Sequence, residues 1–174
     1  VPKELASIGL DRNCFIYKNM FPKDGIILIT GPTGSGKSTL MSSLVAEKLK
    51  EEDCDRIFHT YESPIEFVYD EIIKPSARIY QTPVPEGIRS FDLGIRASLR
   101  RKPDVIIVGE MRDKETIAAG VDACQTGHLV IGTAHTTGVS NATRRLITPF
   151  SENERSSRQI DIISQLHMVV AQRL

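Results

Sequence analysis

The sequence has no long hydrophobic run and no excess of charge of either sign. Its apolar runs, GIILI, VIIVG, LVIG and MVVA, are far shorter than the roughly 20 residues that a membrane-spanning helix needs, so we expect no direct membrane insertion. Lysine plus arginine number 22, and aspartate plus glutamate also number 22. Proteins that coat nucleic acid usually carry a basic excess, so no direct nucleic-acid binding is expected.

Cysteine is scarce as well. Cys14, Cys54 and Cys124 lie far apart, and none stands at the spacing of a zinc site. We expect reduced thiols, as in the cytosol. The chain has 174 residues, about one domain by length, and it begins with Val1 rather than Met. We therefore expect a single domain over residues 1–174 that is a piece of a longer protein.

Short apolar runs alternate with segments of helical period. The expected strands span residues 26–30, 56–61, 77–81, 105–108, 129–133 and 167–172. The expected helices span residues 36–51, 63–73, 91–101, 114–125, 140–146 and 152–166. The strands are apolar without alternation, as in sheets buried on both faces. This pattern predicts an α/β fold with a mainly parallel sheet and helices on both faces.

The pattern S-x-x-E, which is typical of a helix capping box, occurs at 63–66 and at 151–154. Each predicts the start of a helix, and at the first of them Pro64 would take the first helical position. In such a box Glu66 bonds back to the Ser63 backbone. That would give Glu66 a structural role.

The stretch GPTGSGKST fits the phosphate-loop pattern G-x-x-x-x-G-K-[ST] between a strand and a helix. Its glycines let the backbone direct N–H groups at phosphates, and the following helix adds the positive end of its dipole. Lys37 would reach the β- and γ-phosphates, and Ser38 would ligate Mg²⁺. The predicted triphosphate site consists of Gly31, Pro32, Thr33, Gly34, Ser35, Gly36, Lys37, Ser38 and Thr39.

Two carboxylates follow expected strands. Glu110 emerges after the strand at 105–108, at the edge where ligands bind in open α/β sheets, and is the candidate Mg²⁺ ligand through water. Asp104 starts that strand and is expected to be structural. Glu62 has no capping duty, and we predict that it is the general base that activates water.

Basic and imidazole side chains complete the predicted site. His135 follows the strand at 129–133 and faces the same edge, where it would sense a γ-phosphate, whereas His128 at the strand start would lie on the wrong side. Arg96 and Arg100 lie four apart on one helix face. They are either solvated charges or phosphate ligands, of their own or of a neighbouring subunit.

Four segments resemble a known family when taken together and in order. GPTGSGKSTL, YESPIEF, SLRRKPDVIIVGEMRD and TGHLVIGTAHTT are similar to the Walker A, Asp-box, Walker B and His-box motifs of the secretion ATPases. These are the motors of type IV pili and of type II and type IV secretion. The chain resembles the PilT-like ATPases over about residues 25–174. RKPDVIIVGEMRD and NATRRLI look closer to the DotB/TraJ-like ATPases of type IVB secretion and conjugation.

The resemblance implies a RecA-like ATPase domain that uses ATP and Mg²⁺ in a homo-hexamer. It implies a separate N-terminal domain, absent from this chain, and C-terminal helices truncated at Leu174. Glu110 would be the Walker B glutamate, Glu62 the Asp-box glutamate, and His128 with His135 the His-box pair. It also implies a cytoplasmic protein, peripheral to the bacterial inner membrane through secretion-complex proteins and a second cytoplasmic ATPase.

Two departures from the family pattern matter. The Asp box usually reads E-D-P-I-E, whereas Ser63 replaces the aspartate here. Since serine caps helices as well as aspartate does, we expect Ser63→Asp to change activity little. Retraction ATPases tend to carry Q-R-E where this chain has Gln81, Thr82 and Pro83, which weakens an assignment to pilus retraction.

Other uses of a phosphate loop are less consistent with the sequence. A small-molecule kinase would need an arginine-bearing lid, and none follows the last motif. A nucleic-acid translocase would need basic loops, which the zero net charge does not favour. An ABC transporter subunit would carry an SGGQ-like signature, which is absent. The leading prediction is an ATPase motor of type IV secretion or conjugation, with pilus retraction as the alternative and a kinase as the more distant one.

Overall fold

A computed structural model describes residues 1–173, so the predicted truncation at Leu174 lies outside the described residues. Six strands form one sheet in the order β3-β2-β4-β5-β1-β6, and every neighbouring pair is parallel. This confirms the predicted parallel sheet. The strands are β1 Gly25–Thr30, β2 Ile57–Glu62, β3 Arg78–Pro83, β4 Val105–Val108, β5 Leu129–Ala134 and β6 Leu166–Ala171.

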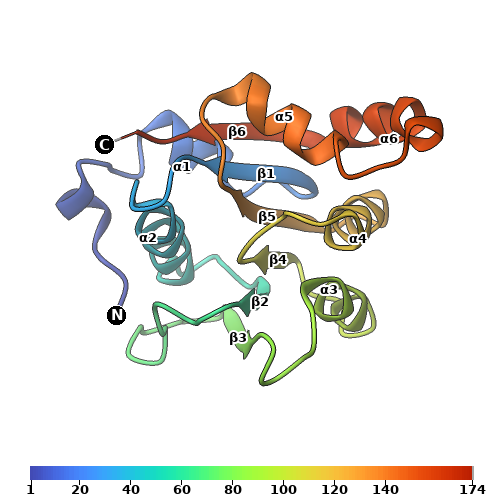
Figure 1. Cartoon of the computed structure of the whole chain (residues 1–174). Coiled ribbons are helices and arrows are strands. Elements are labelled where there is room, and N and C mark those ends of the chain that lie inside the picture. The colour runs from blue at the N-terminus through green and yellow to red at the C-terminus, as the bar shows by residue number, and fades with distance from the viewer. Residues whose placement is uncertain (174) are drawn as a thin grey trace.

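Helices cover both faces of the sheet (Figure 1). One face carries the short 3₁₀ helix η1 and helices α1 and α2, and the other carries α3 to α6. The sequence did not predict η1 and α1, which are short. The bounds are η1 Leu5–Ile8, α1 Phe15–Asn19, α2 Lys37–Leu49, α3 Phe91–Leu99, α4 Lys114–Gln125, α5 Val139–Ile147 and α6 Glu152–Gln165.

Alternate residues of the central strands enter different cores. Ile27 and Ile29 pack on the side of α2, whereas Ile26 and Leu28 pack on the side of α3 to α6. Every residue of β1, β4 and β5 is buried. Apolar residues at successive positions therefore reflect a sheet covered on both faces. No helix in residues 1–173 is long and apolar enough to cross a membrane.

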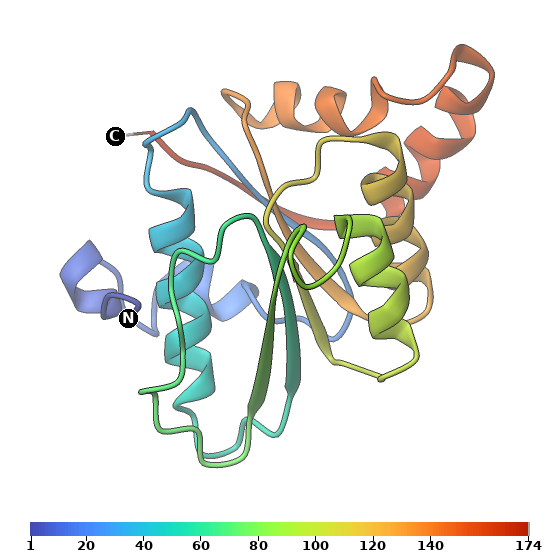
Figure 2. The same ribbon diagram turned by 60° about the horizontal axis from the view of Figure 1, so that its bottom comes forward.

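The helix predicted over residues 63–73 is wrong. The connection from β2 to β3 runs without a helical coil (Figures 1 and 2). Burial alternates along it: Phe67 and Tyr69 face inward while Glu66 and Val68 are exposed, the period of extended chain. The side chain of Gln81 takes up backbone groups of this segment, since it donates to the Phe67 carbonyl and accepts from the Tyr69 N–H.

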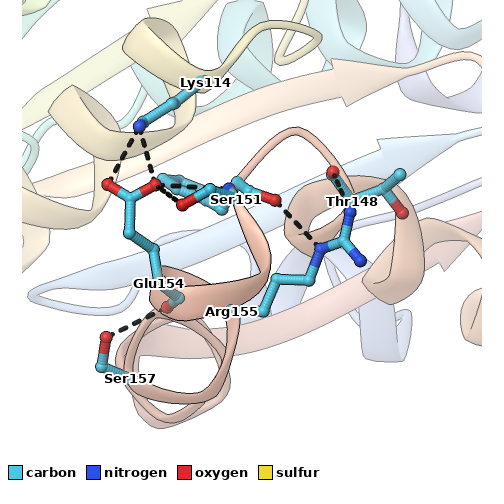
Figure 3. Close-up of polar contacts among 7 residues, drawn as sticks. Lys114, Thr148, Ser151, Glu154, Arg155 and Ser157 are labelled. Carbon is cyan, nitrogen blue, oxygen red and sulfur yellow. Dashed lines mark hydrogen bonds and ion pairs between the residues drawn. The ribbon is translucent and has the colours of Figure 1, made fainter.

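The capping box predicted at 151–154 is present (Figure 3). The Ser151 backbone N–H donates to Glu154 Oε2 at 3.2 Å. Lys114 on α4 donates to both oxygens of the same carboxylate, at 2.9 Å and 2.8 Å. Arg155 donates to the carbonyls of Phe150 and Thr148. These contacts fix the start of α6 and tie it to α4.

Candidate active site

A cavity of about 550 Å³ lies where the carboxyl ends of four neighbouring strands meet. The strand order β2-β4-β5-β1 brings together Glu62 at the end of β2, Glu110 after β4, His135 after β5 and the phosphate loop after β1. This is the edge at which ligands bind in open α/β sheets. The predicted convergence of these motifs at one edge is therefore found in the structure.

The phosphate loop wraps closely around the Lys37 side chain. Lys37 is only 7% exposed, and its Nζ donates to the carbonyl oxygens of Gly31 at 3.0 Å and Pro32 at 2.9 Å. Burial lowers the pKa of Lys37, and the carboxylates of Glu110 and Glu66 oppose that shift. A side chain at Gly31 would place its Cβ 2.5 Å from the Gln172 carbonyl oxygen, so this close approach requires glycine.

The other residues of the phosphate loop differ in burial and in whether they line the cavity. Ser35 is buried, and its Oγ has no hydrogen-bond partner among the described residues. Gly36 has a φ of 80°, the left-handed conformation that favours glycine, and it stands at the start of α2. The residues of the loop that line the cavity are Thr33, Gly34, Gly36, Lys37, Ser38 and Thr39.

The residues predicted to hold Mg²⁺ lie on one cavity. Ser38 lines it from the first turn of α2, and Glu110 lines it from the end of β4. A hydroxyl and a carboxylate are hard oxygen donors, which suit Mg²⁺, and this ion commonly completes its shell with water and phosphate oxygens. In residues 1–173 no cluster of three or more acidic, histidine or cysteine side chains could hold a metal. Ser38 and Glu110 supply two oxygen donors, which fits a Mg²⁺ ion that binds together with a phosphate.

Contacts between β4 and β5 position Glu110. The Met111 N–H donates to the Thr133 carbonyl at 2.9 Å, and the Thr133 hydroxyl donates to the Gly109 carbonyl. Glu110 itself is partly exposed, with an oxygen 4.0 Å from Arg112 Nη1. Arg112 also lines the cavity. The carboxylate thus stands on a fixed backbone and still reaches the cavity.

Glu62 is held by one of its two oxygens. Its Oε1 accepts hydrogen bonds from Thr60 Oγ1 at 2.7 Å and from Gln81 Nε2 at 3.1 Å. Burial raises the pKa of Glu62, these two hydrogen bonds oppose the rise, and the neighbouring carboxylate of Glu66 adds to it. A half-buried carboxylate with a raised pKa at a cavity wall is suited to general-base chemistry.

Glu66 also lines this cavity, although it was predicted to bond back to the Ser63 backbone in a capping box. Because no helix forms over residues 63–73, Glu66 caps no helix, and its side chain is exposed on the cavity. Its charge raises the pKa of both Glu62 and Lys37. Ser63 caps no helix either, so the predicted reason for a neutral Ser63→Asp is wrong. Ile65, Phe67 and Tyr69 stand at alternate positions, but Val68 between them is apolar too, so the sequence alone carries no clear signal for extended chain.

The two histidines lie at opposite ends of β5, as predicted. His135 lines the cavity, with Nδ1 3.5 Å from Lys37 Nζ and 3.5 Å from Thr33 Oγ1. His128 lies before β5, where Nδ1 is 3.1 Å from the Ala123 carbonyl oxygen. Of these histidines, only His135 contacts the phosphate loop.

Arg96 and Arg100 do not approach the phosphate loop of their own chain. Both are exposed, Arg96 in α3 and Arg100 at its end, and neither lines the cavity. If these arginines contact a phosphate as predicted, that phosphate must therefore belong to a nucleotide bound by another subunit. It stays a prediction.

A family model described as "Type II/IV secretion system protein" matches residues 11–174. The chain is 44% identical over 177 residues to the type II secretion system ATPase E of Vibrio cholerae, covering 98% of this chain and 31% of that protein. It is 38% identical over 150 residues to the type IV pilus retraction ATPase PilT of Pseudomonas aeruginosa, covering 86% and 42%.

Solved structures of ATPases share this fold. The Legionella pneumophila ATPase DotB superposes with a TM-score of 0.90 at 48% identity, covering 95% of this chain and 44% of that one. The pilus retraction motor PilT with bound ADP gives 0.89 at 36%, covering 100% and 49%. The fold is thus the RecA-like P-loop fold, and the chain spans less than half the length of each of these four relatives. Motifs, fold and family model agree, and this chain belongs to the type II/IV secretion system protein family.

Proposed function

We propose that this chain binds ATP with Mg²⁺ and hydrolyses it, as the motor of a type IV secretion or conjugation system. The observation that carries the proposal is the convergence of Lys37, Ser38, Glu62 and Glu110 on one cavity. A phosphate clamp, two oxygen donors for a metal and a partly buried base are what phosphoryl transfer to water requires.

The residues of the cavity divide the work of hydrolysis. Glu62 accepts a proton from the attacking water, whose oxygen bonds to the γ-phosphorus as the bond to the β–γ bridging oxygen breaks and ADP leaves. Lys37 offsets charge on the phosphates. Ser38 and Glu110 would hold Mg²⁺, which neutralises phosphate charge when bound. His135, 3.5 Å from Lys37, is the residue that we assign to sensing the γ-phosphate.

The choice of system rests on similarity. Identity to DotB is 48%, against 36% for PilT, at nearly equal TM-scores. Pilus retraction is the second candidate, because PilT superposes over the whole chain. A small-molecule kinase is the more distant one.

We further propose the setting in which this chain works. Residues 1–174 form one RecA-like domain of a longer protein with an N-terminal domain and further C-terminal helices. Six copies make a ring on the cytoplasmic side of the bacterial inner membrane. Secretion-complex proteins, and with them a second cytoplasmic ATPase, hold the ring there without membrane insertion or nucleic-acid contact by this chain.

The first test is ATP turnover per subunit in the intact protein, measured against protein concentration. If a neighbour completes the site, turnover per subunit rises as subunits assemble. Substantial turnover that stays flat down to concentrations at which the protein is shown to be monomeric would exclude the ring motor. It would favour a kinase-like transfer instead.

Lys37→Ala tests the phosphate loop directly. We expect ATP binding and turnover to be lost, because the phosphates lose a buried cation and a single such donor is commonly worth about 10²–10³ in rate. Lys50→Ala is the matched control, since Lys50 lies just beyond α2 and its one ion pair within residues 1–173 is with Glu47. Full activity in Lys37→Ala would refute the assignment of the loop.

A further inference from the structure

The side chain of Gln81 makes three hydrogen bonds, one of them to Glu62, which lines the cavity. Its Nε2 donates to Glu62 Oε1 at 3.1 Å and to the Phe67 carbonyl at 2.8 Å. Its Oε1 accepts from the Tyr69 N–H at 3.3 Å. Both amide hydrogens are therefore used. Gln81 joins the Glu62 carboxylate at the end of β2 to segment 63–73.

The strand register explains why these groups meet. Gln81 on β3 pairs with Thr60 on β2, and Glu62 follows Thr60 by two residues. Residues two apart on a strand, and residues paired across strands, point to the same face of a sheet. Thr60, Glu62 and Gln81 therefore share one face, and their polar groups converge at the end of β2.

Both donors bind the same oxygen of Glu62. Oε1 accepts from Thr60 and from Gln81, whereas Oε2 accepts from none of residues 1–173. Oε2 is not among the enclosed polar atoms that lack a partner, so solvent reaches it. The carboxylate is anchored on one side and open on the other. That is the geometry of a base that must hold still while it receives a proton.

We propose that Gln81 is the positioning residue for Glu62: it anchors Oε1 and leaves Oε2 to take the proton of the attacking water. This inference rests on the proposed function and adds a residue to it. The competing view is structural, namely that Gln81 only holds segment 63–73 in place through Phe67 and Tyr69. The two views predict opposite orders for two substitutions.

The kcat values of Gln81→Met and Gln81→Glu, measured in the intact protein with ATP, distinguish the positioning role from the structural role. Gln81→Met loses all three hydrogen bonds. Gln81→Glu keeps an acceptor for the Tyr69 N–H, but it loses the donors to Glu62 and to the Phe67 carbonyl and adds a like charge beside Glu62. A positioning role makes Gln81→Glu at least as slow as Gln81→Met, whereas a structural role makes it faster. We expect Gln81→Met to lower kcat by about 10–100-fold, the usual loss for an outer-shell partner, with KM little changed.

The pH dependence of kcat is a second readout. The carboxylate loses a donor in Gln81→Met, which raises the pKa of Glu62 further, so the acid limb of the profile moves to higher pH. A structural role would scale the profile without moving it. The other titratable groups around Glu62 are Glu66, Tyr69, Lys37, Glu110, Arg112 and His135.

Gln81→Met in a Glu62→Gln background shows whether Gln81 acts on turnover through Glu62. Gln81→Met should cause no further loss there, because the base it positions is gone. An undiminished loss in that background, or a Gln81→Glu variant faster than Gln81→Met, would overturn the proposal. Normal turnover in Glu62→Gln itself would instead refute the base in the proposed function, so the two failures are distinguishable.

Folding is controlled within the experiment. ADP binding reports the fraction of protein with an intact phosphate loop, and turnover is expressed per bound ADP. Gln159→Met is the matched control, since Gln159 is exposed on α6 away from the active-site cavity. If Gln81→Met binds no ADP, Thr60→Val replaces it, because it removes the other donor to Oε1. An acid limb at the wild-type pH in Thr60→Val would then count against the anchored oxygen.

Discussion

The pattern S-x-x-E stands before two segments of this chain and has two different outcomes. At 151–154 it forms a capping box at the start of α6. At 63–66 it starts no helix, and its glutamate lines the active-site cavity. The two stretches offer the same local hydrogen bonds. Their difference shows that a capping signal is decided by what the following residues can bury and bond.

Tertiary partners account for the difference. Lys114 braces Glu154 from α4, and Ile162 of α6 is fully buried in the core shared with α4. After Pro64 the chain instead buries alternate residues, and Gln81 takes up the backbone groups of Phe67 and Tyr69 that a helix would have needed. Propensity is a weak prior that such contacts override.

Glu62→Gln should have the largest effect in this comparison. We expect ATP binding to persist and turnover to fall by about 10²–10⁴, the usual worth of a positioned general base. The measurement is kcat beside ADP affinity. A wild-type rate would move the role of base to Glu66 or Glu110, and Glu154→Gln serves as the remote control.

Glu66→Gln tests whether the second glutamate of the pattern belongs to the site. If Glu66 capped a helix, its substitution would lower the free energy of unfolding. If Glu66 is a carboxylate of the cavity, its substitution changes the pKa of the neighbouring groups. Since the Glu66 charge raises the pKa of Glu62, its removal should lower that pKa, and the acid limb of kcat should move to lower pH. The loss of turnover at neutral pH should be smaller than for Glu62→Gln. A limb that stays in place would remove Glu66 from the site.

Much of the site could be predicted from the sequence because it depends on local chemistry. The glycines of the phosphate loop determine its backbone conformation locally. Glu110 directly follows a short apolar strand, so the sequence places it at the carboxyl edge of the sheet. Glu66 and Gln81 could not be placed in this way. Their roles arise from the pairing of β3 with β2, which joins residues far apart in the sequence.

Ser151→Ala and Ser63→Ala compare the two patterns in stability. Loss of the cap at α6 should lower the free energy of unfolding by about 1 kcal/mol. Ser63→Ala should change it by less than about 0.5 kcal/mol, the usual range for a surface site, since Ser63 is exposed and caps no helix. Urea unfolding of the two variants measures the difference. Equal losses would mean that residues 63–66 do form a cap in solution.

The smallest effect expected is a pH dependence of stability that belongs to Glu154 alone. The ammonium of Lys114 and the contacts of Ser151 lower the pKa of Glu154 from its ordinary 4.5 to about 2. A lowered pKa means that the contribution is complete above the ordinary value and is lost as the pH falls from about 4.5 through about 2. The difference in free energy of unfolding between the wild type and Glu154→Gln should therefore disappear across that window.

The Glu154 carboxylate is at the surface, so added salt should shrink this difference in free energy, and Lys114→Met should abolish most of it. A difference between wild type and Glu154→Gln that is constant from neutral pH to about pH 2 would show that the carboxylate stabilises α6 without its charge.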